Sequence, residues 1–141
     1  EEALADLRHE SAERLEAAGA TLEWTVEDGS GSGSGMSARV LHALRPMLRE
    51  AINNIVKHAD ARSVTVTVKQ EGEAGGVAIS VADDGKGFDI DSVPAGHHGL
   101  LGMRVRVESH SGDLYVHSAM HQGTRVEAEL PAHPTTNAEP A

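Results

Sequence analysis

Two alternating runs of apolar and polar residues in the middle of the chain constrain the fold more than any other feature. They read SVTVTVKQ (63–70) and GVAISVAD (76–83), and a short Gly-rich segment separates them. A period of two places every second side chain on the same face, which is the pattern of a half-buried strand. The two runs therefore predict an antiparallel hairpin.

A long amphipathic helix is predicted before this hairpin, over residues 37–59, with Ser37 as its N-cap. Pro46 has no backbone N–H to donate, so we expect it to kink or divide the helix. Apolar side chains recur at helical spacing on one face, which we expect to pack on the core. They are Leu41, Leu44, Leu48, Ile52, Ile55 and Ala59.

The other periodic segments complete an order of α, β, α, β, β, α, β, β. Helices are predicted over 2–18 and 99–110, with Gly19 ending the first, and strands over 21–27, 112–119 and 123–131. This order predicts an α+β fold, a two-layer sandwich in which helices cover one face of a mostly antiparallel, mixed sheet. Aromatic residues make up only 2% of the chain, so we expect an aliphatic core.

Two segments are expected to lie outside the main domain, and a third forms a linker within it. The run GSGSGSG (29–35) predicts a flexible linker, either engineered or a natural low-complexity loop. The tail, 132–141, is expected to be disordered. Because the chain opens as though in the middle of a helix, we interpret 1–19 as the end of a preceding region and 20–131 as the main domain of a fragment.

The bulk composition excludes several classes of function. Twelve basic residues face 22 acidic ones, for a formal charge of −10, which argues against a nucleic-acid groove. The chain has no cysteine, so disulfides and thiolate metal sites are excluded. No apolar run approaches the roughly 18 residues of a membrane helix, and no signal peptide is visible. We therefore expect a cytoplasmic domain without direct membrane contact.

The main predicted helix also carries a polar stripe. Glu50 and Asn54 are four residues apart, and Lys57 and His58 return to the same stripe, nearly opposite the apolar face. A row of this kind is usually a solvated helix face. By itself it does not identify a site.

Glycines follow the second strand of the hairpin. The stretch DDGKG places Asp83, Gly85 and Gly87 where the strand ends. Asp-Gly after a strand is a common turn signal, so an ordinary turn is one interpretation. The other is a ligand site, in which a carboxylate is held at the strand end and the glycines let a ligand approach the backbone.

Two further segments offer candidate residues. GHHGLLGM places Gly99 and Gly102 at the start of the last predicted helix, where unpaired N–H groups favour phosphate. Arg104 and Arg106 follow and are among the few positive charges available. QGTR places Thr124 at the head of the last strand.

Together, REAINNIVKHADA, DDGKGF, GHHGLLGM and QGTRVEAELP carry a resemblance. They look like the N, G1 and G2 boxes and the closing strand of the GHKL ATPase superfamily, and above all of the ATP-binding domain of two-component sensor histidine kinases. The match in order and spacing covers residues 21–131. The short segment between Gly87 and Gly96 resembles the short-lid, nitrate-sensor-type subfamily, and the implied fold is the two-layer Bergerat type.

The resemblance implies roles for the purine end of a nucleotide site. Asp83 would accept a hydrogen bond from the adenine amino group, which suits a carboxylate because it only accepts. Gly85 and Gly87 would let the base approach the backbone. Thr124 would lie near the adenine.

It also implies roles around the phosphates. Asn54 would hold Mg²⁺ through its side-chain oxygen, and Lys57 would neutralise phosphate charge. Glu50 would be the acid/base residue or would orient the metal and the acceptor. The backbone N–H groups of the second glycine box would bind the phosphates; its residues are Gly99, Leu100 and Gly102.

The implied function is transfer of the ATP γ-phosphoryl group to a histidine on a dimerisation domain, for relay to a response regulator. The acceptor histidine is expected to be absent from this chain, and the fragment to be a monomer. Two alternatives stay open. One is a serine kinase of the same fold acting as an anti-sigma factor, and the other is a nucleotide-binding or partner-docking module without turnover.

Overall fold

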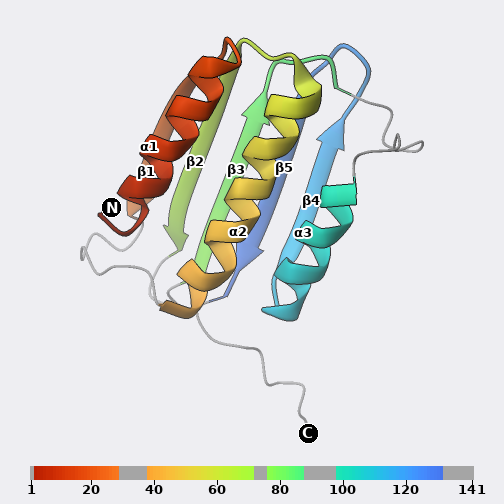
Figure 1. Ribbon diagram of the computed structural model, residues 1–141. Helices are drawn as coiled ribbons and strands as arrows, with labels where there is room; N and C mark the ends of the chain where they lie inside the picture. The colour runs from red at the N-terminus through yellow and green to blue at the C-terminus, as the bar shows by residue number, and fades with distance from the viewer. Residues whose placement is uncertain (1, 29–37, 72–75, 88–97, 132–141) are drawn as a thin grey trace, which may run out of the picture.

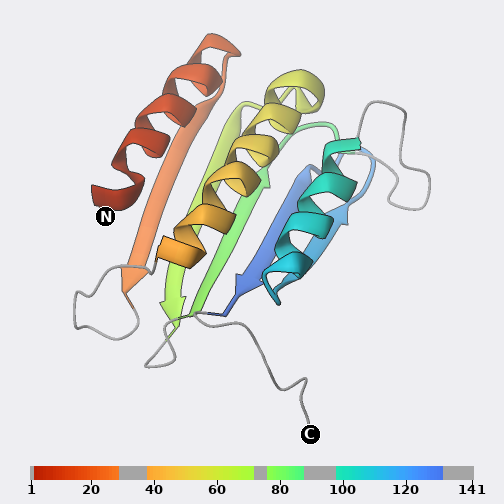
Figure 2. The ribbon, with the colours of Figure 1, turned by 60° about the horizontal axis from the view of Figure 1, so that its bottom comes forward.

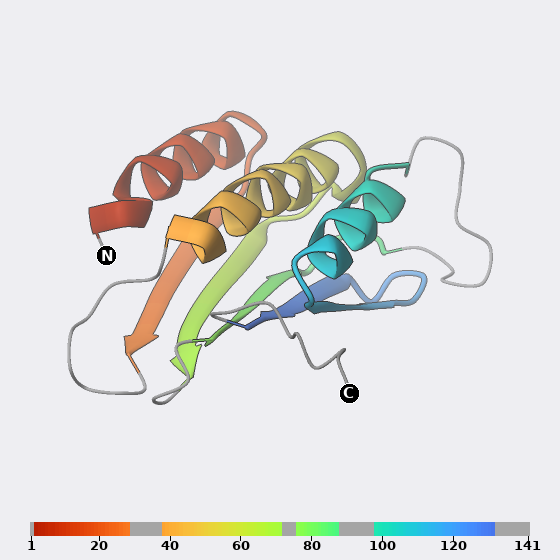
Figure 3. The same cartoon turned by 90° about the horizontal axis from the view of Figure 1, so that it is seen from below.

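A mixed sheet of five strands forms one layer of the protein, and three helices cover one of its faces (Figures 1 and 3). The computed structural model describes residues 2–28, 38–71, 76–87 and 98–131. Its strands are β1 (Thr21–Asp28), β2 (Ser63–Glu71), β3 (Gly76–Asp83), β4 (Asp113–Ser118) and β5 (Thr124–Leu130). Its helices are α1 (Glu2–Ala17), α2 (Ala38–Asn54) and α3 (His98–Ser109), and a π-turn, η1 (Ile55–Ala59), follows α2. The predicted element order and fold class are confirmed.

The strands lie in the order β1-β2-β3-β5-β4. β1 pairs with β2 in parallel and every other pair is antiparallel, so the predicted hairpin is present, with Val66 opposite Val81. The parallel pair needs a crossover, and α2 lies in that connection. α1 packs on β1, α2 lies over β3, and α3 packs on β4 and β5 (Figure 2).

The core between the two layers is aliphatic, as the low aromatic content predicts. Alternate residues of β2 and β3, from Val64 to Val68 and from Val77 to Val81, are buried under the helices. The predicted apolar face packs on them: Leu44, Leu48 and Ile52 of α2 and Ile55 of η1 are buried, and Leu41 is half-buried. Ala59 is the exception, because its side chain lies outside the described part.

Pro46 does not divide the main helix, so that part of the prediction is wrong. α2 runs without interruption from Ala38 to Asn54 with Pro46 inside it. A proline inside a helix costs about 3 kcal/mol. Burial of the apolar face on both sides of Pro46 offsets that cost, because a fully buried Leu or Met contributes about 2 kcal/mol.

The predicted α-helix over 37–59 also ends differently. Its last five residues form the π-turn η1, and Asp60 follows in the left-handed conformation, with φ 56° and ψ 43°. A π-turn advances each residue by less than the 100° of an α-helix, so Lys57 does not lie where α-helical spacing places it. Ser37, the predicted N-cap, lies outside the described residues.

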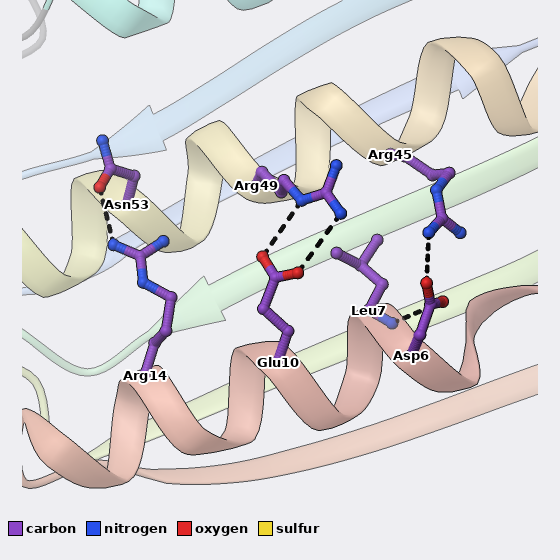
Figure 4. A network of polar contacts seen from close by, with 7 residues as sticks. All are labelled: Asp6, Leu7, Glu10, Arg14, Arg45, Arg49 and Asn53. Carbon is purple, nitrogen blue, oxygen red and sulfur yellow. Dashed lines mark hydrogen bonds and ion pairs between the residues drawn. The ribbon is translucent and has the colours of Figure 1, made fainter.

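A ladder of three polar contacts fastens α1 to α2 (Figure 4). Arg45 Nη2 donates to Asp6 Oδ2 at 2.6 Å, and Arg49 Nε donates to Glu10 Oε2 at 3.1 Å. In the third rung Arg14 Nη2 donates to Asn53 Oδ1 at 2.9 Å. Residue numbers rise together along the ladder, so the two helices run in the same direction. α1 is thus packed into the helical layer.

Within the described ranges, no helix combines the length and the apolar character needed to cross a membrane.

Candidate functional site

One end of the sheet gathers most of the residues singled out in the sequence. β3 ends there at Asp83, β5 begins there at Thr124, and α2 ends there at Asn54 (Figure 1). The register places Asp83 directly opposite Thr124. Because Asp83 alternates with buried Ile79 and Val81, its side chain lies on the face of the sheet that the helices cover.

Asp83 is a half-buried carboxylate anchored by backbone amides. Gly85 N donates to its Oδ1 at 2.7 Å. Burial raises the pKa of Asp83 above its ordinary value, and the neighbouring charge of Asp84 adds to that rise. The amides of Gly85 and Thr124 act in the opposite direction by stabilising the charged form. The site therefore holds a partly desolvated acceptor in a defined orientation.

Thr124 has a polar neighbour that the sequence reasoning missed. Ser118 Oγ lies 2.8 Å from Thr124 Oγ1 and donates to the carbonyl oxygen of Gly123 at 3.2 Å. Ser118 ends β4 and pairs with Thr124 across the last hairpin. The predicted hairpin of β4 and β5 could have revealed this pair, because residues opposite each other at its closed end share a face.

Two glycines are required by close backbone packing at this end. Gly87 has a φ of 63° and Gly123 a φ of 78°, a region that side chains rarely adopt. A Cβ on Gly87 would overlap the carbonyl oxygen of Ala119, and one on Gly123 would overlap that of Asp83. His121 N also donates to Lys86 O at 2.6 Å. The DDGKG turn is thus packed against the β4–β5 hairpin, and Gly85 within it is buried.

Asp84, next to Asp83, has a structural role. Its Oδ1 accepts hydrogen bonds from the amides of Arg62 and Ser63, each at 2.9 Å. These bonds, chiefly the one from Ser63, hold the pKa of Asp84 below its ordinary value of 3.8. The two adjacent aspartates therefore have different roles: Asp84 caps the start of β2, whereas Asp83 is partly desolvated on the helix-covered face of the sheet.

We expect Asp84→Ala to lower the free energy of unfolding by about 1 kcal/mol at neutral pH, because two backbone amides lose their acceptor. A carboxyl whose folded pKa is depressed stabilises the fold above pH 3.8, and that contribution is lost as the pH falls through the depressed pKa. Urea unfolding at a series of pH values measures this. A difference from wild type that stays constant down to low pH would contradict it.

The candidates on α2 lie around its last two turns. Glu50 and Asn54 are half-buried, and Lys57 in η1 is exposed. Glu50 lines a cleft of about 400 Å³ between the helices. Its lining residues are Arg14 of α1, Pro46, Arg49, Glu50 and Asn53 of α2, and Gly102, Met103 and Arg106 of α3.

The candidates on α3 lie at its start. α3 begins at His98, so Gly99 and Leu100 belong to its first turn, where backbone N–H groups lack intrahelical acceptors. Gly102 is exposed, and an added Cβ would meet no atom within 4 Å. The structure thus brings Glu50 and Gly102 to one cleft and Asp83 and Thr124 to one row of the sheet. Neither Asp83 nor Asn54 is among the residues that line the cleft.

Comparison with known proteins identifies the family. Residues 39–134 match the model of the histidine kinase-, DNA gyrase B-, and HSP90-like ATPase family. Over 118 residues the chain is 30% identical to the sensor histidine kinase LiaS of Bacillus subtilis, covering 84% of this chain and 31% of that protein. Over 110 residues it is 36% identical to the histidine-protein kinase/phosphatase UhpB of Salmonella typhimurium, covering 78% of this chain and 20% of that protein.

Solved structures show the same fold. The histidine kinase domain of the blue-light activated histidine kinase of Erythrobacter litoralis aligns with a TM-score of 0.64 at 19% identity, over 92% of this chain and 61% of that one. This chain therefore spans only part of each protein it matches. Because the family model covers most of the chain, the predicted family is confirmed: the chain belongs to the histidine kinase-, DNA gyrase B-, and HSP90-like ATPases and corresponds to the catalytic ATPase domain of sensor histidine kinases.

Proposed function

We propose that this chain binds Mg-ATP and supplies the γ-phosphoryl group that a larger sensor kinase transfers to a histidine of its own dimerisation domain. The observation that most supports this proposal is Asp83, a partly desolvated carboxylate on the helix-facing side of the sheet. Burying part of a carboxylate costs free energy, so its position at a strand end on the helix-covered face favours a binding role. The curated relatives, named as sensor histidine kinases, support the wider assignment.

Asp83 accepts a hydrogen bond from the adenine amino group, which selects ATP over GTP, because guanine has a carbonyl oxygen at that position. Gly85 lets the ring approach the backbone just after β3, and Gly87, in the left-handed conformation, shapes the DDGKG turn beside it. Thr124, oriented by its contact with Ser118, lies beside the purine. Repulsion between a carboxylate and a carbonyl oxygen is the physical basis of this selectivity.

The phosphate groups lie toward the helices. Asn54, half-buried at the end of α2, fits a magnesium ligand because an amide oxygen is a hard donor and Mg²⁺ accepts few protein ligands. Magnesium supplies charge neutralisation between phosphate oxygens when it is bound. Lys57 adds positive charge from η1, the N–H groups of Gly99 and Leu100 in the first turn of α3 face the phosphates, and Gly102 keeps the surface beside them free of a side chain. Glu50 orients the acceptor.

The partners follow from the transfer reaction. The phosphohistidine passes its phosphoryl group to an aspartate of a response regulator, so that contact is indirect for this domain. We assign residues 20–131 to the ATP-binding domain and residues 1–19 to the end of the dimerisation region, whose helix α1 packs against that domain. The reaction takes place in the cytoplasm, where ATP is available.

Isothermal titration calorimetry with ATP and GTP, each with and without Mg²⁺, tests nucleotide binding. We expect ATP to bind, Mg²⁺ to strengthen that binding, and GTP to give no measurable heat. GTP binding as tight as ATP binding would contradict the adenine assignment.

The transfer reaction is tested by adding the purified dimerisation domain of the same kinase with labelled ATP. Acid-labile, base-stable label on that domain is the expected result, because phosphohistidine has this stability. Acid-stable label would instead indicate a serine kinase, and no label despite ATP binding would indicate a module without turnover.

A further inference from the structure

The cleft beside Glu50 is unusually cationic for this chain. Three of the 12 lysines and arginines, one from each helix, line its volume of about 400 Å³, although the whole chain carries a formal charge of −10. They are Arg14, Arg49 and Arg106, and Glu50 is the only carboxylate among the described lining residues. A local excess of positive charge against a negative global field favours an anionic ligand.

The three arginines are not equally available to a ligand. Glu10 Oε2 and Oε1 accept from Arg49 Nε and Nη2 at 3.1 and 3.3 Å, so the charge of Arg49 is neutralised. Arg14 is oriented by the side-chain oxygen of Asn53 at 2.9 Å (Figure 4). Because an amide is neutral, Arg14 is held in place without an ion pair to any residue in the described part of the chain. Arg106 is exposed and forms no ion pair among the residues that the structure describes.

We propose that Arg14 and Arg106 clamp the terminal phosphoryl group of ATP in this cleft. This inference rests on the proposed function, in which Glu50 works next to that group, and Arg14, Glu50 and Arg106 line the same cleft. A guanidinium donates two parallel N–H bonds to an oxyanion. Two guanidiniums, one from α1 and one from α3, balance the negative charge of the terminal phosphoryl group, which ADP lacks.

The clamp is tested by comparing ATP with ADP in the variants Arg14→Gln and Arg106→Gln. Arg8→Gln is the matched control, since Arg8 is an exposed residue of α1 outside the cleft lining. Calorimetry with Mg²⁺ is expected to show about tenfold weaker ATP binding for each cleft variant, from one lost charged hydrogen bond. ADP affinity is expected to change less than about twofold, and Arg8→Gln to match wild type for both nucleotides.

The ratio of ATP to ADP affinity decides the result. If Arg106→Gln weakens both nucleotides equally, or leaves both unchanged, the clamp is wrong even though the domain binds ATP. Because Arg106 is exposed, this variant is expected to fold, and an unchanged thermal midpoint confirms that for each protein measured. Failure of the wild-type domain to bind either nucleotide would instead count against the proposed function itself.

Discussion

Asp83→Asn is expected to weaken ATP binding by about 100-fold, corresponding to about 3 kcal/mol for a lost charged hydrogen bond and the unpaired group left behind. The amides of Gly85 and Thr124 both donate to the carboxyl group in the wild type. They will retain the single oxygen of asparagine, which leaves its NH₂ group facing the adenine amino group. A donor then meets a donor. Calorimetry with Mg-ATP measures the loss.

The same substitution is expected to raise the stability of the nucleotide-free protein at neutral pH. Burial raises the folded-state pKa of Asp83, so the folded protein holds that proton more tightly than the unfolded chain does. The carboxylate therefore costs stability above its raised pKa, and the cost disappears as the pH falls below the ordinary value of 3.8. Asparagine, which is neutral throughout, avoids the cost.

Thermal unfolding across pH separates these two effects. Asp83→Asn is expected to unfold at a higher temperature than wild type near pH 7 and to lose that advantage toward pH 3. Asp84→Ala serves as the control, because its difference from wild type has the opposite sign at neutral pH. An Asp83→Asn protein that binds ATP as tightly as wild type would remove the basis of the adenine assignment.

Gly123→Ala is expected to destabilise the fold by about 3 kcal/mol or more. The left-handed backbone alone costs a side chain about 1–2 kcal/mol. The added Cβ would also overlap the backbone oxygen of Asp83, and backbone in a sheet cannot move aside as a flexible side chain can. A shift of β3 against β5 would relieve the overlap, and it would displace the carboxylate that we assign to adenine. We therefore expect a lower urea midpoint together with weaker ATP binding.

Gly102→Ala is the matched control for stability. An added Cβ there meets no atom within 4 Å, and Gly102 lies inside α3. Alanine in a helix interior is favoured over glycine by about 1 kcal/mol, so this variant is expected to unfold at an equal or higher urea concentration. If the two glycine variants lose stability to the same extent, close backbone packing at Gly123 is not the cause.

The sequence predicted the elements and the fold because their signals are local. Periods of two and of 3.6 residues, with Gly19 as a helix stop, define the strands and helices that the structure contains. The pairing of Asp83 with Thr124 joins strands from two different predicted hairpins, so the sequence pattern did not predict it. The four sequence boxes, taken together and in order, identified the family, which no single box could do.

Other features depend on contacts that a local pattern does not contain. The π-turn after Asn54 preserves an apolar spacing that also fits an α-helix, so periodicity could not distinguish the two. Pro46 is tolerated because α2 packs on the sheet, and helix propensities do not include such packing. Arg14 and Asn53 are 39 residues apart in the sequence, and only the helical layer brings them together. Arg14 and Arg49 were therefore missed, and Arg106 was noted only as a positive charge.

The ladder between α1 and α2 also sets the axial position of one helix relative to the other, because its rungs repeat every four residues but its charges do not. Sliding α1 by one helical turn in one direction sets Arg14 against Arg49, which opposes like charges. Sliding it in the other direction sets Glu10 against the neutral Asn53 and moves Arg14 past the end of α2. A single axial position of α1 therefore satisfies all three rungs, so the helix bearing Glu50 and Asn54 has a fixed reference along its length.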